Sequence, residues 1–201
     1  RLGVSQAAFY RHFPDKAALL EGIAEQVWRL TFESFLDRVD TGAFDPESTP
    51  TPAASESTED APASPLLTYM RAYAHCLAST LRSHPGAVML LLTHPMSTPE
   101  QLSLLARVFV TLARRGFTPN ADMLGLVNAV SIYTTAFVAA EVVPPVGGSP
   151  EQPADLSAAS AALDPEDAQA LHPLIEDLLD GRYDFNAQFE RGLEAILRGW
   201  H

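Results

Sequence analysis

The first twenty residues, RLGVSQAAFYRHFPDKAALL, carry the side chains with the clearest chemical use. Leu2-Gly3-Val4-Ser5 has the composition of a tight turn between two helices, because glycine adopts a positive φ at little cost and serine caps helices well. Residues 6–13 then supply about two turns of helix. Val4, Phe9 and Phe13 can face inward. The side chains left for the outer face and the N-terminal end are Gln6, Ala7, Ala8, Tyr10, Arg11 and His12.

These outward residue types suit a helix that enters the major groove of DNA. Gln and Arg can read base edges, small side chains allow close approach, and Tyr and Lys can hold phosphates. In a helix-turn-helix, the second helix reads the bases with its N-terminal residues. The alternative is an ordinary amphipathic helix pair with no DNA role.

Three blocks at fixed spacing make the reading more specific: Leu2-Gly3-Val4-Ser5, Phe9-Tyr10-x-His12-Phe13 and Asp15-Lys16-x-x-Leu19-Leu20. Together they resemble the recognition helix and the following helix of the tetracycline repressor (TetR) family of bacterial transcription regulators. The resemblance implies a three-helix DNA-binding head followed by a helical body, with Lys16 placed against a phosphate. The residues it assigns to DNA binding are Ser5, Gln6, Ala7, Ala8, Tyr10, Arg11, His12 and Lys16.

The family head has two helices before this turn, whereas the sequence starts at Arg1 within the motif. We therefore expect that the native protein has a longer N-terminus. We also expect the present chain to bind DNA weakly or not at all.

The remainder of the sequence predicts an all-α fold. Asp15 is an N-cap candidate after Pro14, and Leu19, Ile23, Val27, Leu30 and Phe35 form the expected apolar stripe of the first body helix. Pro99, Gly116, Asn120 and Pro144 mark further helix starts and stops. The short apolar run 87–93 could be helix or strand. The expected helices span 15–39, 66–83, 99–115, 120–142, 165–180 and 185–199.

The family resemblance continues weakly into the body, through His84-Pro85-Gly86, Arg115-Gly116-Phe117 and Phe185-x-x-x-Phe189-x-x-Gly192-Leu193. It implies domains at 1–14 (the end of the DNA-binding head), 15–39 (connecting helix), 40–65 (flexible linker) and 66–201 (ligand binding and dimerisation). The linker is expected because residues 40–65 are rich in Pro and acidic residues and contain no Lys or Arg.

A small-molecule pocket is expected among polar-tipped, soft or aromatic residues on otherwise apolar helices, since such residues line mainly apolar ligand sites. Ordinary core packing is the alternative for each of them. The candidates are Tyr69, Tyr73, Cys76, Met89, His94, Phe109, Asn128, Tyr133 and Phe137.

Two segments are candidates for a homodimer interface of the kind the family forms from two helices per subunit. Residues 123–142 are dense in small residues that permit close helix contact, and residues 185–200 present an apolar stripe at helical spacing. Packing within a monomer is the alternative for both segments. The small residues are Gly125, Ala129, Ser131, Ala136, Ala139 and Ala140, and the stripe is Phe185, Phe189, Leu193, Ile196, Leu197 and Trp200.

Charge and composition limit the other function classes. The formal net charge is −12, yet residues 1–16 carry +2, so the acidity belongs to the body and does not argue against DNA as a partner. The sequence contains no run of about 18 apolar residues, so it predicts no membrane-spanning helix. The lone Cys76 fits a reducing compartment such as the cytoplasm.

The sequence therefore predicts a ligand-responsive, DNA-binding transcription regulator, expected to be a repressor that a small molecule releases from its operator. The alternative is a dimeric small-molecule-binding protein without DNA binding. An enzyme is not expected, because no nucleophile elbow, phosphate loop, metal motif or carboxylate pair is present. We expect no catalytic residues, metal or cofactor, and the effector's identity does not follow from the sequence.

Overall fold

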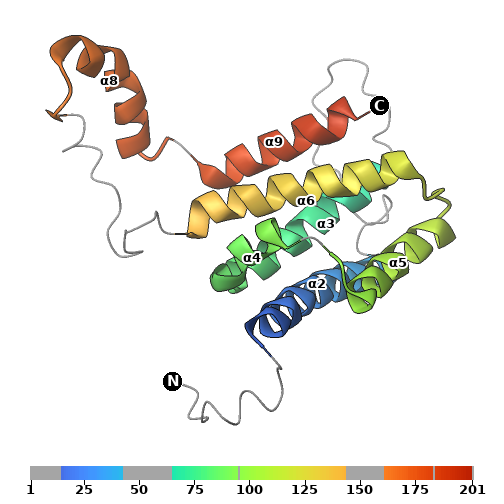
Figure 1. The fold of residues 1–201 in the computed structure, drawn as a ribbon. Helices are drawn as coiled ribbons and strands as arrows, with labels where there is room; N and C mark the ends of the chain where they lie inside the picture. Colours follow the sequence, from blue (N-terminus) through green and yellow to red (C-terminus); the bar gives the residue numbers. More distant parts are fainter. Residues whose placement is uncertain (1–14, 43–64, 95, 144–160, 183, 201) are drawn as a thin grey trace, which may run out of the picture.

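The computed structural model describes residues 15–42, 65–94, 96–143, 161–182 and 184–200, and in these ranges every regular element is a helix. The all-α prediction is thereby confirmed (Figure 1). The predicted DNA-contacting residues from Ser5 to His12 lie outside the described residues. So do residues 43–64 of the expected 40–65 linker, whereas Asp40 and Pro65 at its two ends belong to helices. The elements are α2 (Lys16–Asp40), α3 (Pro65–Ser83), the 3-10 turn η1 (Pro85–Ala87), α4 (Val88–Thr93), α5 (Pro99–Arg114), α6 (Ala121–Val142), α8 (Pro165–Leu179) and α9 (Phe185–Gly199).

Helix starts follow the capping residues in the sequence. Asp15 accepts a hydrogen bond from the Ala18 backbone N–H at 2.8 Å, and Asn120 accepts one from the Met123 N–H at 2.8 Å. Thr98 and Gln101 form a reciprocal capping box at the start of α5, which satisfies two orphan donors at once. The predictions for Asp15 and Asn120 are confirmed, and the capping box is a further feature that the structure shows.

The buried face of α2 differs from the predicted stripe. Ile23 is 38 % exposed, and Leu19 and Leu30 are only half-buried. The reason is that α2 packs against α3 on one side and α5 on the other, which buries a wide arc centred on aromatic side chains. That arc consists of Ala24, Val27, Trp28, Thr31, Phe32, Phe35, Leu36 and Val39.

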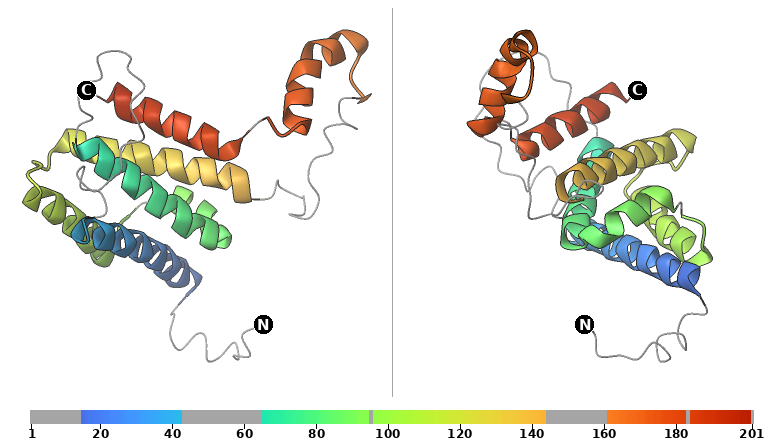
Figure 2. Two further views of the ribbon diagram at one scale, coloured as in Figure 1. Left: turned by 180° about the vertical axis from the view of Figure 1, so that it is seen from behind. Right: turned by 60° about the vertical axis from the view of Figure 1, so that its left-hand side comes forward.

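Helix α3 lies at the centre of the bundle, between α2 on one side and α6 on the other (Figures 1 and 2). Helix α4 packs on α6, α5 packs on α2, and α9 runs along α6 and also contacts α3. Arg82 of α3 forms a bidentate ion pair with Glu141 of α6 at 2.9–3.1 Å. The Arg71 and Arg198 guanidiniums both bond Glu194, and they hold the pKa of that carboxyl below its usual value.

The ambiguous run 87–93 is helical. Pro85 and Gly86 form one 3-10 turn, and α4 continues from Val88 with its side chains at Val88, Leu90 and Leu91 buried. Six residues are too few to decide between helix and strand from periodicity alone. Packing on α6 decides it here.

Helix α6 is long and apolar enough to pass as a membrane span by length and composition. The absence of an 18-residue apolar run in the sequence therefore does not by itself exclude one. Its surroundings are those of a helix inside a bundle, because α3, α4 and α9 all pack against it and Val130, Thr134 and Val138 are fully buried.

Helix α8 lies apart from the other helices in all of the views (Figures 1 and 2). Its prediction at 165–180 is confirmed, with Asp164 as the N-cap. Leu171, Leu174 and Leu178 on this helix are all exposed.

Gly116 gives a stability prediction. It ends α5 with φ +91°, its N–H bonds the Ala113 carbonyl, and the Phe117 N–H bonds the Leu112 carbonyl at 3.2 Å. We expect Gly116→Ala to lower the unfolding free energy by about 1–2 kcal/mol, because a Cβ is disfavoured at positive φ. Urea unfolding measures this. Gly86→Ala is the control, since Gly86 has open space around it and no positive φ, and equal effects at both glycines would contradict the account.

Candidate functional site

A cavity of about 260 Å³ lies between α2, α4, α5 and α6, with the segment between α4 and α5 on its border. Most of its surface is aliphatic, and a few neutral polar groups interrupt it. An apolar cavity with a few convergent polar groups is the usual form of a small-molecule site. The residues that line it are Trp28, Leu91, Leu92, His94, Met96, Leu105, Leu124, Val127, Asn128, Ser131, Ile132 and Thr135.

Ser131 connects the cavity to the core of the bundle. Its hydroxyl donates to the Val127 carbonyl at 2.7 Å, so the contact of 2.8 Å with the Tyr73 hydroxyl must have tyrosine as the donor. Tyr73 is 1 % exposed, and burial raises its pKa well above the ordinary value for a tyrosine. Tyr73 is therefore a neutral donor, and Ser131 presents acceptor capacity to the cavity.

His94 has a defined tautomer in this arrangement. Its Nδ1 lies 3.2 Å from the Leu90 carbonyl and 3.0 Å from the Thr93 hydroxyl oxygen. Because that hydroxyl donates its proton to the Met89 carbonyl at 2.9 Å, Nδ1 carries a hydrogen and donates to Leu90. In the neutral ring, Nε2 is then an acceptor.

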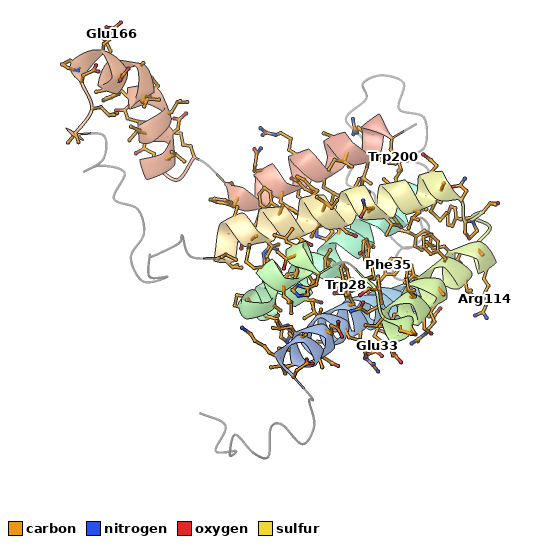
Figure 3. The ribbon with its side chains drawn as sticks, viewed as in Figure 1. Trp28, Glu33, Phe35, Arg114, Glu166 and Trp200 are labelled. Carbon is orange, nitrogen blue, oxygen red and sulfur yellow. The ribbon has the colours of Figure 1, made fainter. Side chains whose placement is uncertain are left out.

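Trp28 contributes the aromatic wall of the cavity, from the side of α2 that faces into the bundle (Figure 3). Its ring stacks on Phe32 at 5.6 Å, and Phe32 stacks on Tyr73 at 6.0 Å. The indole Nε1 is buried and has no hydrogen-bond acceptor among the described residues. Trp28 was not among the predicted pocket residues. The signal that could have found it is its place on the buried face of α2, four residues before Phe32.

The predicted pocket residues divide into three groups. His94 and Asn128 line the cavity, and Tyr73 lies behind it through Ser131. The others do not line it. Cys76 is buried and accepts a hydrogen bond from Ser34 at 3.6 Å, and Met89 is half exposed on α4.

The remaining aromatic candidates pack elsewhere. Tyr69 meets Phe117 edge to face at 5.6 Å, and Phe109 is half-buried against the core. Tyr133 and Phe137 belong to a cluster that joins α6 to α9, where both rings contact Phe189. These residues therefore lie on helices, or on faces of helices, that do not border the cavity.

The α6–α9 contact depends on two glycines. Tyr133 donates to the Phe189 carbonyl at 3.0 Å, and a Cβ on Gly192 would lie 2.1 Å from the tyrosine hydroxyl. The ring of Trp200 lies close to Gly125 in the same way. The apolar stripe of α9 is accordingly used within the chain, since Phe189, Leu193 and Leu197 are buried.

Of the predicted DNA-binding residues, Lys16 alone falls within the described part of the chain. It is exposed and is the first residue of α2. Across the described residues, no group of three His, Cys, Asp or Glu side chains could hold a metal ion.

The Tyr73–Ser131 bond gives a prediction for stability. Ser131→Ala leaves the buried tyrosine hydroxyl without its acceptor and should lower the unfolding free energy by about 1–3 kcal/mol. Adding Tyr73→Phe removes the orphaned group, so the double variant should be more stable than Ser131→Ala alone. A double-mutant cycle by urea unfolding tests this, and additive effects would show that the bond contributes nothing.

Comparison with known proteins finds two family models that match this chain, one at its start and one over the rest of it. Residues 1–23 match the family model of bacterial regulatory proteins of the tetR family, and residues 61–201 match that of the tetracyclin repressor-like C-terminal domain. The fold is similar to the crystal structure of a possible TetR family transcriptional regulator from Streptomyces coelicolor A3(2), with a TM-score of 0.60, 21 % identity, and 98 % of this chain and 82 % of that chain covered. The curated proteins gave no match. The second model spans more than half of this chain. The chain therefore belongs to the TetR family and is a transcriptional regulator.

Proposed function

We propose that the protein is a cytoplasmic, homodimeric repressor that a small molecule releases from its operator. The observation that carries the proposal is the position of Trp28. It lines the cavity, and it lies on the same helix as Lys16, the residue at which α2 follows the recognition segment. A molecule in the cavity therefore contacts the helix that leads directly to the DNA-binding residues.

Release would follow from differential affinity. A homodimer places two recognition helices about 34–36 Å apart, one turn of DNA. A ligand that binds better to a dimer shape with another spacing shifts the population toward that shape and weakens DNA binding by linkage. This mechanism requires α2 to move relative to α6, and both helices contribute side chains to the cavity lining.

The exposed side of α6 supports the dimer. Leu124, Ile132, Ala136 and Ala140 are exposed on one side of a helix whose other faces are packed; they lie four residues apart except that Asn128 stands between the first two. Leu124 is 49 % exposed and Ile132 is 55 % exposed. Such an apolar ridge with small residues at one end suits close packing against a second copy.

Lys16 gives a test of DNA binding. With the complete gene product and an operator selected from random duplexes, Lys16→Ala should weaken binding to all sequences alike and lower the slope of log K against log salt by about 1. Fluorescence anisotropy at several salt concentrations measures both. Arg107→Ala, an exposed cation on α5, is the control and should leave the slope unchanged. A complete protein that selects no duplex would favour the ligand-binding alternative.

The dimer is tested separately. Ile132→Asp places a charge on the exposed α6 ridge and should convert a dimer to a monomer in sedimentation velocity, because the charge would be buried without a partner. Leu102→Asp is the matched control, since Leu102 is 52 % exposed on α5. Dissociation by both variants, or by neither, would contradict this interface.

A further inference from the structure

The cavity opens on the exposed ridge of α6. Leu124, Asn128 and Ile132 follow one another at four-residue spacing, and all three line the cavity and are exposed. Leu92 of α4 also lines the cavity and is 41 % exposed. A side chain that lines a cavity and is exposed as well stands at its mouth. In a single copy of the chain, the described residues thus leave a mouth rimmed mainly by apolar side chains.

The exposed side of α6 lacks the charges of an ordinary surface helix. Between Asp122 and Glu141 the sequence contains no Asp, Glu, Lys or Arg, and α3, α4 and α9 pack against the other faces of the helix. A helix that faces water normally carries charged residues on its outer side. An uncharged and largely apolar outer side indicates a surface that a partner covers.

A second copy of the chain is the partner that the ridge fits. In a two-fold dimer the same uncharged patch meets itself, so no ion is buried. A specific interface buries about 800 Å² per partner, which is a patch about 28 Å across. The ridge from Leu124 to Ala140 rises about 24 Å along the helix. A copy that packs on Ala136 and Ala140 therefore also covers Leu124 and Ile132, at the mouth of the cavity.

We propose that the ligand site is completed only in the dimer, where the second copy closes the mouth of each cavity over Leu124 and Ile132. The inference rests on the proposed function in taking the cavity as the ligand site and the ridge as the dimer interface. In the closed cavity, a bound apolar molecule is removed from water on the side that a single copy leaves open.

Closure fixes the direction of the coupling between ligand and dimer. The ligand binds the dimer more tightly than the monomer, and by linkage each bound ligand strengthens the dimer by the same factor. An effector of this kind cannot act by separating the subunits. Release from the operator has to come from a change of shape within an intact dimer.

Ala140→Asp tests the closure without altering the cavity, because Ala140 lies on the ridge but does not line the cavity. It stands five residues beyond Thr135, the last lining residue on α6, which is about 7.5 Å along the helix. Ala136→Asp is a second variant of the same kind. Ala113→Asp is the matched control, since Ala113 is also exposed near the end of a helix, on α5.

The probe is N-phenyl-1-naphthylamine, an uncharged aromatic molecule whose fluorescence rises in apolar surroundings, titrated into the complete gene product. Sedimentation velocity gives the oligomeric state of each variant, and circular dichroism checks its helical content. Leu105→Trp fills the cavity with a larger side chain and gives the background signal from probe on the outer surface. That background is subtracted from every titration.

We expect both ridge variants to be folded monomers that bind the probe at least tenfold more weakly than the unmodified dimer. Ala113→Asp should remain dimeric and bind normally. Saturating probe should also lower the dimer dissociation constant of the unmodified protein at least tenfold. Tenfold corresponds to about 1.4 kcal/mol, or about 55 Å² of apolar surface removed from water.

The outcomes separate the inference from the proposed function. Monomeric ridge variants that bind the probe as tightly as the unmodified dimer would overturn the closure and leave the dimeric repressor standing. Ridge variants that stay dimeric, or an unmodified protein that is monomeric, would overturn both the closure and the proposed interface. No cavity-specific signal in the unmodified dimer also overturns the closure. If the ridge variants fail to fold, the unmodified protein decides: a dimer dissociation constant that the probe leaves unchanged or raises contradicts the inference.

Discussion

A line of ring contacts and one hydrogen bond joins α2, α3 and α6 beside the cavity. Trp28 stacks on Phe32, Phe32 stacks on Tyr73, and the Tyr73 hydroxyl donates to Ser131. The line runs from α2 through α3 to α6, and both of its ends line the cavity. The relative position of α2 and α6 is therefore set by stacked rings and one buried hydrogen bond, so a displacement at one wall must be accommodated at the other.

This line also explains why the cavity has a neutral polar character. Tyr73 is fully buried, which keeps it protonated, and its proton is committed to Ser131. The charged side chains of these helices pair at the edges of the bundle, as Arg82 does with Glu141. None of the described residues that line the cavity is Asp, Glu, Lys or Arg.

The limits of the helices could be predicted from the sequence because they depend on local chemistry. Asp15 and Asn120 cap the helices that follow them, and Gly116 ends α5 at a positive φ. Each of these signals acts within four residues. The predictions for the helix bounds therefore agree with the structure to within one or two residues.

The cavity could be predicted only in part, because it depends on which helix faces meet. His94 and Asn128 were found by residue type, yet Tyr133 and Phe137 have the same character and pack on α9 instead. Asn128 and Tyr133 lie five residues apart on α6, about 140° apart around the helix, but the sequence does not say which of these faces meets the cavity. The width of the buried arc on α2, which brings Trp28 into the wall, likewise follows from α3 and α5 packing on both of its sides.

Helix α6 borders the cavity, packs against α9 and also carries an exposed apolar ridge. One side lines the cavity through Val127, Ser131 and Thr135, and another holds α9 through Tyr133 and Gly125. The exposed ridge between them includes Leu124 and Ile132, which also line the cavity. If a second copy packs on this ridge, a ligand that shifts these two side chains changes the dimer contact directly. The effect of ligand binding would then reach the dimer contact across the width of one helix.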